Sequence, residues 1–92
     1  MSVEERRTQV ISVLDAPAVG KVRIAKASSK YDRRQRYLVV EWCPPEWVDT
    51  DLEEHAYRVL RDWHPANTPD NMAAARAFQS GAWHALRAKA QQ

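Results

Sequence analysis

Glycine, cysteine and long apolar runs are scarce in this sequence, and each scarcity excludes a class of protein. Only two of the 92 residues are glycine, so no glycine-rich loop is present to hold phosphates with backbone amides. Cys43 is the single cysteine, which rules out an intramolecular disulfide and suits a reducing compartment. No run is apolar enough to cross a membrane, and the charged start Met1–Arg7 lacks the apolar segment of a signal peptide. We therefore expect a cytoplasmic protein that does not enter a membrane.

Side chains that carry most catalytic and metal chemistry are also few. The three histidines, His55, His64 and His84, are too widely spaced along the chain to form a recognised metal-binding motif. No serine, threonine or cysteine stands in a recognisable nucleophile motif. The sequence therefore predicts a protein without catalytic residues, bound metal or cofactor, and we expect it not to be an enzyme.

The residues that are plentiful indicate one folded domain spanning residues 1–92. Hydrophobic side chains make up 45% of the chain, and four of them are tryptophans, each of which buries on the order of 200 Å² in a core. Four tryptophans are many for a domain of this size. We therefore expect some of this aromatic surface to face outward, with Trp47 and Trp83 as candidate anchors for a partner protein.

The order of apolar and polar residues predicts strands in the first half of the chain and helices in the second. β-Branched or alternating segments indicate strands at about 8–14, 21–27 and 36–42. Helices are expected at about 51–63 and 69–89. The predicted fold is an α+β domain, in which a three-stranded antiparallel sheet packs on a C-terminal helical hairpin.

Local signals support both helices. Thr50 and Glu53 have the spacing of a capping box. Thr68 before Pro69 is typical of a helix start, where the missing proline N–H costs nothing. Gly81 interrupts an alanine-rich helix, which we interpret as a close contact between the two helices.

Charge is unevenly distributed although the net charge is only +2. Basic side chains and one tyrosine gather on the predicted hairpin of strands two and three, and acidic side chains begin the first helix. Such cations can bind phosphates or an acidic protein surface, or can simply be solvated. The candidate contact residues are Lys21, Arg23, Lys26, Lys30, Tyr31, Arg33, Arg34 and Arg36.

One family resemblance spans the predicted helices. The segment Ala56–Leu86, with Ala-Tyr-Arg-Val-Leu followed by Trp63-His64-Pro65, resembles helices two and three of a J-domain and the His-Pro-Asp tripeptide between them. Ala66 stands in place of the aspartate through which such domains stimulate their chaperone. The resemblance thus implies a chaperone-interaction module with a degenerate tripeptide.

Together these features predict a small binding module that engages a larger protein or nucleoprotein complex through the basic hairpin, as a monomer or homodimer. Small proteins of this kind include inhibitors of host machinery encoded by phages and mobile elements, such as anti-CRISPR proteins. A DNA- or RNA-binding regulator is the first alternative, and the J-domain-like module is the second.

Overall fold

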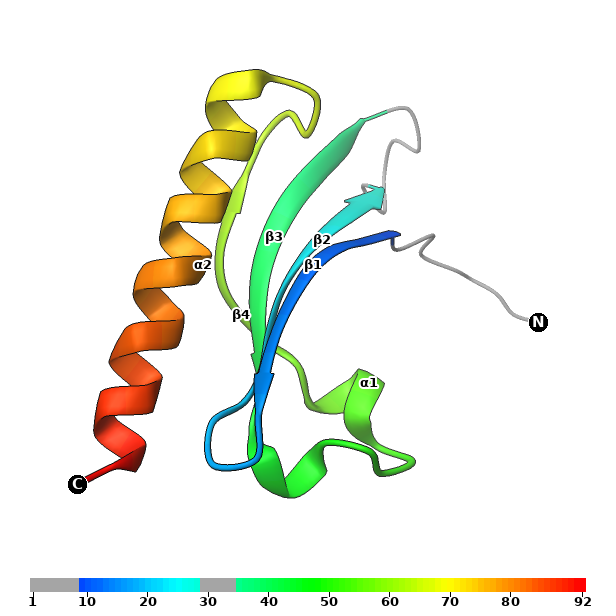
Figure 1. Ribbon diagram of the computed structural model, residues 1–92. Helices are drawn as coiled ribbons and strands as arrows, with labels where there is room; N and C mark the ends of the chain where they lie inside the picture. Colours follow the sequence, from blue (N-terminus) through cyan, green and yellow to red (C-terminus); the bar gives the residue numbers. More distant parts are fainter. Residues whose placement is uncertain (1–8, 29–34) are drawn as a thin grey trace.

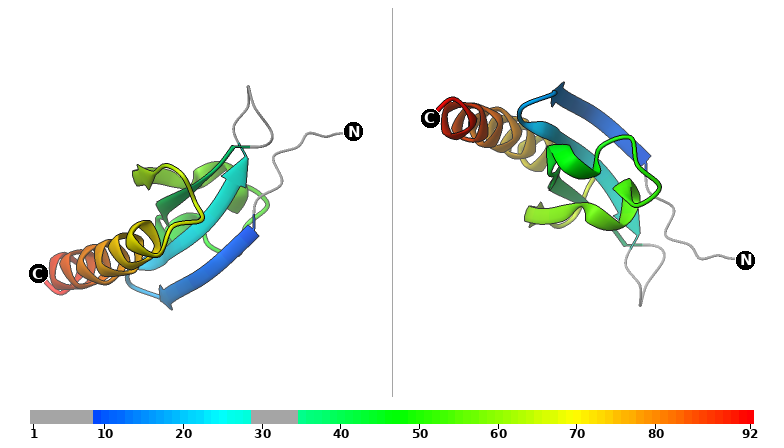
Figure 2. Two further views of the ribbon diagram at one scale, coloured as in Figure 1. Left: turned by 90° about the horizontal axis from the view of Figure 1, so that it is seen from above. Right: turned by 90° about the horizontal axis from the view of Figure 1, so that it is seen from below.

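One antiparallel sheet and one long helix dominate the computed structural model, which describes residues 9–28 and 35–92 (Figure 1). The four strands are adjacent in chain order. They are β1 (Gln9–Ala16), β2 (Gly20–Ser28), β3 (Arg36–Cys43) and β4 (Arg58–Trp63). The helix α2 (Pro69–Ala90) lies on one side of the sheet. The short helices η1 (Pro45–Trp47) and α1 (Glu53–Ala56) lie on the other (Figure 2).

The first three strands occupy the segments in which the sequence predicted strands. Their register assigns side chains to the two faces, since residues opposite one another in antiparallel strands point the same way. Ile24 of β2 stands opposite Val40 of β3, and both are buried on the side of α2. Arg23 stands opposite Glu41 on the side of α1. The alternation in the sequence is therefore that of a sheet covered unequally on its two faces.

The predicted fold class is wrong in its second half, because the segment expected to be the first helix is divided between a helix and a strand. Helix α1 has four residues and ends at Ala56, because the next residue, Tyr57, has the φ of −65° and ψ of 132° of extended backbone. The chain then forms β4, which pairs antiparallel with β3 and places Trp63 opposite Leu38. Within the described ranges the sheet has four strands, and α2 packs on it without a second long helix. The resemblance to a J-domain implies a helix where the structure has β4.

Tertiary pairing explains why the helical pattern of this segment was misleading. The free edge of β3 offers a row of backbone partners, whereas an isolated helix of about a dozen residues is marginal in water. The register shifts between Val40 and Glu41, and this irregularity alters the strict alternation that marks a strand. Thr50 accepts a hydrogen bond from the amide of Leu52 (3.2 Å), and Glu53 accepts one from the amide of Asp49 (2.8 Å). The predicted capping box is therefore not formed: α1 starts after Leu52, which has no side-chain cap hydrogen bond.

Helix α2 begins as its sequence indicates. The Thr68 hydroxyl accepts a hydrogen bond from the amide of Asn71 at 3.2 Å, and Pro69 is the first helical residue. Ala75 is fully buried against the core residues Val22, Ile24, Leu38 and Val40. Gly81 does not lie in a close helix–helix contact, because a Cβ placed there meets no atom within 4 Å.

A buried glutamine also joins α2 to the sheet. Gln79, 4% exposed, accepts a hydrogen bond from the Ser12 hydroxyl (3.1 Å) and donates to the carbonyls of Ser12 (3.2 Å) and Val22 (3.0 Å). The register between β1 and β2 shifts between Val10 and Ser12. The amide of Gln79 thus fixes the helix where the ladder is irregular. Among the described residues, no helix is both long and apolar enough to cross a membrane.

Candidate functional site

Two of the predicted contact cations, Lys21 and Arg23, bind carboxylates of their own chain. The Nζ atom of Lys21 lies 3.1 Å from Glu53 Oε2 and 4.0 Å from Asp49 Oδ1. Arg23 donates from Nε to Glu41 at 2.8 Å and from both terminal nitrogens to Glu54 at 3.2 Å. The acidic segment after β3 therefore folds back onto the basic strand β2.

This polar cluster is partly buried, and its groups hold one another in their charged forms. Arg23 is 7% exposed, and its guanidinium lies 3.7 Å from the centroid of the Tyr57 ring. Burial by itself lowers the pKa of Arg23, but the hydrogen bonds to Glu54 and Glu41 outweigh it and leave the pKa raised. The hydrogen bond to Glu53 raises the pKa of Lys21. The hydrogen bond from the Asp49 amide lowers the pKa of Glu53, and the hydrogen bond from Lys21 lowers it by a smaller amount.

A basin of about 530 Å³ borders this cluster and includes His55 and Val59 at its wall. Its most buried polar group, Arg23, is already satisfied by Glu41 and Glu54. The cluster is thus organised to attach α1 to the sheet rather than to await a ligand. Within residues 9–28 and 35–92, no three potential metal ligands lie close together. Cys43 is free and fully buried, and burial raises the pKa of its thiol.

The other predicted contact residues differ in burial and in position, and some lie outside the described residues. Lys26 and Arg36 are half-buried, and the register places both on the face that carries α2. Trp47 ends η1 with 38% of its surface exposed, whereas Trp83 is partly buried against the core. The remaining four residues lie outside the described part of the chain: Lys30, Tyr31, Arg33 and Arg34.

The internal ion pairs leave the two sides of the sheet with opposite charge. On the side of α1, acids outnumber the two paired cations, and the exposed ones are Asp15, Glu46, Asp49, Asp51, Glu54 and Asp62. On the side of α2, the bases of residues 9–28 and 35–92 outnumber the one acid described there, Asp70, and they include Lys26, Arg58, Arg61, Arg76, Arg87 and Lys89. An acidic partner is therefore attracted to the side of α2.

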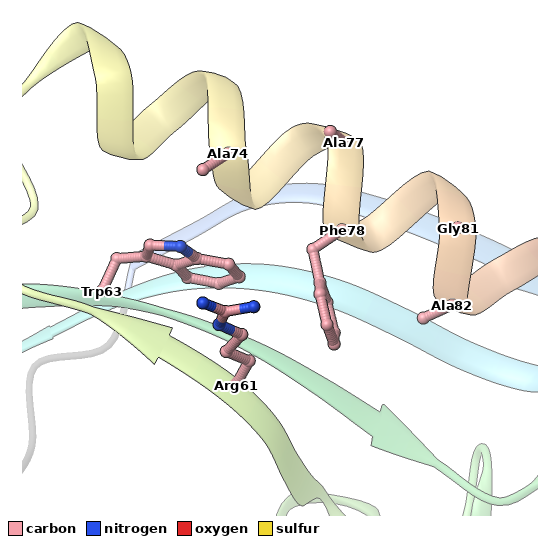
Figure 3. A pocket seen from close by; sticks show the side chains of 7 residues that line it. All are labelled: Arg61, Trp63, Ala74, Ala77, Phe78, Gly81 and Ala82. Carbon is pink, nitrogen blue, oxygen red and sulfur yellow. The ribbon is translucent and has the colours of Figure 1, made fainter.

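An apolar groove of about 590 Å³ lies on this basic side, between β4 and α2 (Figure 3). The rings of Trp63 and Phe78 form its inner part, with centroids 5.6 Å apart and planes at 71°. The Arg61 guanidinium lies 5.5 Å from the Trp63 centroid and 5.9 Å from that of Phe78. The helical wall consists of small residues, namely Ala74, Ala77, Gly81 and Ala82.

The strand that borders the groove is unusually exposed. Every residue of β4 before Trp63 is exposed, and Leu60 and Val59 are 38% and 62% exposed. In the part of the chain that the structure describes, β4 pairs with β3 alone. One edge of its backbone is therefore open, directly beside the groove.

Sequence reasoning does not find this groove, because it predicts helices for both of its walls. Arg61 and Trp63 reach the same side only when residues 58–63 form a strand. The one available signal is Gly81 within an alanine-rich helix, which by itself favours a helix–helix contact. No family, curated protein or solved structure compared with this chain matches it.

Proposed function

We propose that this protein is a non-catalytic binding module that engages a partner protein through the groove between β4 and α2. The observation that carries the proposal is the open edge of β4 beside an apolar groove. β4 is short and carries the charged residues Arg58, Arg61 and Asp62, as exposed edge strands usually do. Here an edge strand adjoins an aromatic-lined concavity, which is the arrangement of a recognition surface.

The sequence predicts that the basic hairpin contacts the partner, but the ion pairs of β2 favour the groove between β4 and α2 instead. Lys21 and Arg23 are bound by carboxylates of α1 and β3, so neither offers its full charge to a phosphate. This weakens the alternative of a nucleic-acid-binding regulator. Inhibition of a host complex, such as a CRISPR surveillance complex, stays a prediction. Such an inhibitor would bind its target through the same groove.

Site-specific photo-crosslinking in cells of the source organism tests this function. A benzophenone side chain at Ala77, on the groove wall, should crosslink one partner protein, whereas the same group at Glu46, beside α1, should not. Gly81→Leu should abolish the Ala77 crosslink because its side chain fills the groove. Gly81→Ala should preserve it, since the added Cβ meets nothing.

As a control, circular dichroism and thermal unfolding should show that both Gly81 variants are folded. Crosslinks that form equally from Glu46, or that survive Gly81→Leu, would show that the partner binds elsewhere. Crosslinks to nucleic acid alone would favour the regulator instead.

A further inference from the structure

We infer that the groove is occupied by an extended, acidic segment of the partner, which adds to β4 as a fifth strand. This inference rests on the proposed function and specifies the chemistry of its ligand.

Backbone pairing is the first element of this recognition. β4 has six residues, so its open edge extends for about 20 Å. It contains neither proline nor glycine, and among the described strands its outer edge is unpaired. The irregularity at Leu60 divides this edge into two short stretches, residues 58–59 and 61–63, to which an added strand can pair. An added strand obtains its affinity from such main-chain hydrogen bonds and its specificity from alternate side chains.

The dimensions of the groove fit the side chains of an added strand. Alternate residues of a strand point to the same face at intervals of about 6.7 Å. From Ala74 to Gly81 the axis of α2 rises by about 10 Å, which leaves space for two such side chains. The small residues Ala74, Ala77 and Gly81 of α2 line the groove together with Trp63 of β4 and Phe78 of α2. Two apolar side chains at alternate positions of the partner therefore fit this space.

The charge of the groove predicts an acidic residue in the partner's segment. Arg61 lies against two aromatic rings, and the structure shows no carboxylate bonded to it among the described residues. Arg58 lies 5.8 Å from the Trp42 ring on the same side. Both guanidiniums stay available for the planar, two-pronged binding of a carboxylate. We expect an aspartate or glutamate beside the apolar residues of the partner.

A second copy of this chain fits the groove poorly. Helix α2 lies over β2 and β3. If two β4 strands paired across a twofold axis, strand spacings of about 4.8 Å would place the two α2 axes about 19 Å apart. Packed helices lie about 8–10 Å apart. Such a dimer would leave both grooves empty, and it would bring the basic sides of two copies together.

Selection from a library of random twelve-residue peptides tests the inference on the intact chain. Peptides that bind the wild type but not Gly81→Leu should share two alternate apolar residues and an adjacent acid. Titration of the selected peptide should shift the NMR signals of β4 and of residues 74–82. Replacing the acid by its amide should weaken binding to the wild type about tenfold, and to Arg61→Gln less than twofold.

N-methylation of the peptide separates strand addition from the proposed function itself. Methyl groups on alternate amides that face β4 should weaken binding about tenfold or more, whereas methyl groups on the other amides should change it less than twofold. Equal effects of the two patterns would refute strand addition but leave the groove as the binding site. Recovery of no groove-dependent peptide, or a β4-dependent dimer in analytical ultracentrifugation, would overturn the inference.

Discussion

The strongest quantitative expectation concerns the partners of Arg23. Glu41 and Glu54 both bind this guanidinium, but their side chains are 13% and 69% exposed. Removing one member of a buried ion pair costs about 3–5 kcal/mol, because the other charge is left desolvated. Glu54 remains to bind Arg23 in the Glu41→Gln variant, so we expect a smaller loss of about 2–3 kcal/mol. The Glu54→Gln variant should lose less than about 1 kcal/mol, as exposed pairs do.

Urea unfolding at neutral pH, followed by tryptophan fluorescence, measures both losses. For a denaturant slope between about 1 and 2 kcal/mol per molar, Glu41→Gln should lower the midpoint by about 1–3 M. Adding 0.5 M NaCl should remove most of the Glu54→Gln effect and little of the Glu41→Gln effect, because buried pairs are screened less. Equal losses for the two variants, or a Glu41→Gln loss below about 1 kcal/mol, would refute this reasoning.

Three further variants test other features by the same unfolding assay. Gly81→Ala should raise stability by about 1 kcal/mol, since it removes a mid-helix glycine and meets no atom; a decrease would mean that the helix wall is not open. Gln79→Ala should cost about 2–3 kcal/mol, because it leaves two backbone carbonyls and the Ser12 hydroxyl without their partner; a neutral result would contradict its burial. The lowered pKa of Glu53 stabilises the fold above the ordinary glutamate range near about pH 4, and this contribution is lost as the pH falls through the folded pKa. Glu53→Gln should therefore flatten the acid side of the stability–pH curve, and an unchanged slope would contradict the Lys21–Glu53 pair.

The elements that sequence reasoning located well are those whose signals are local. The Thr68–Pro69 start of α2 depends on one hydroxyl and one missing N–H, and both are visible in the sequence. The strand 36–42 alternates cleanly and lies within β3.

Residues 58–63 show why the remainder was missed. Their apolar residues fit a helical face as well as a strand, and the choice depends on β3 having an unpaired edge. That edge exists only in the folded sheet, so no local pattern reports it. Lys21 and Arg23 were predicted to contact a partner, and this prediction neglected long-range pairing in the same way. The acids that neutralise them come from segments 18 to 32 residues away.

The opposite charge of the two sides of the sheet has a kinetic consequence. A molecule with such a dipole rotates as it approaches a charged surface, so encounters with an acidic body begin with α2 and β4 foremost. Misoriented collisions become rarer, and the association rate rises above that of an uncharged domain of equal size. Added salt should therefore lower the association rate while leaving the dissociation rate nearly unchanged. The basic residues of α2 thus act on the approach of the partner, before the groove is occupied.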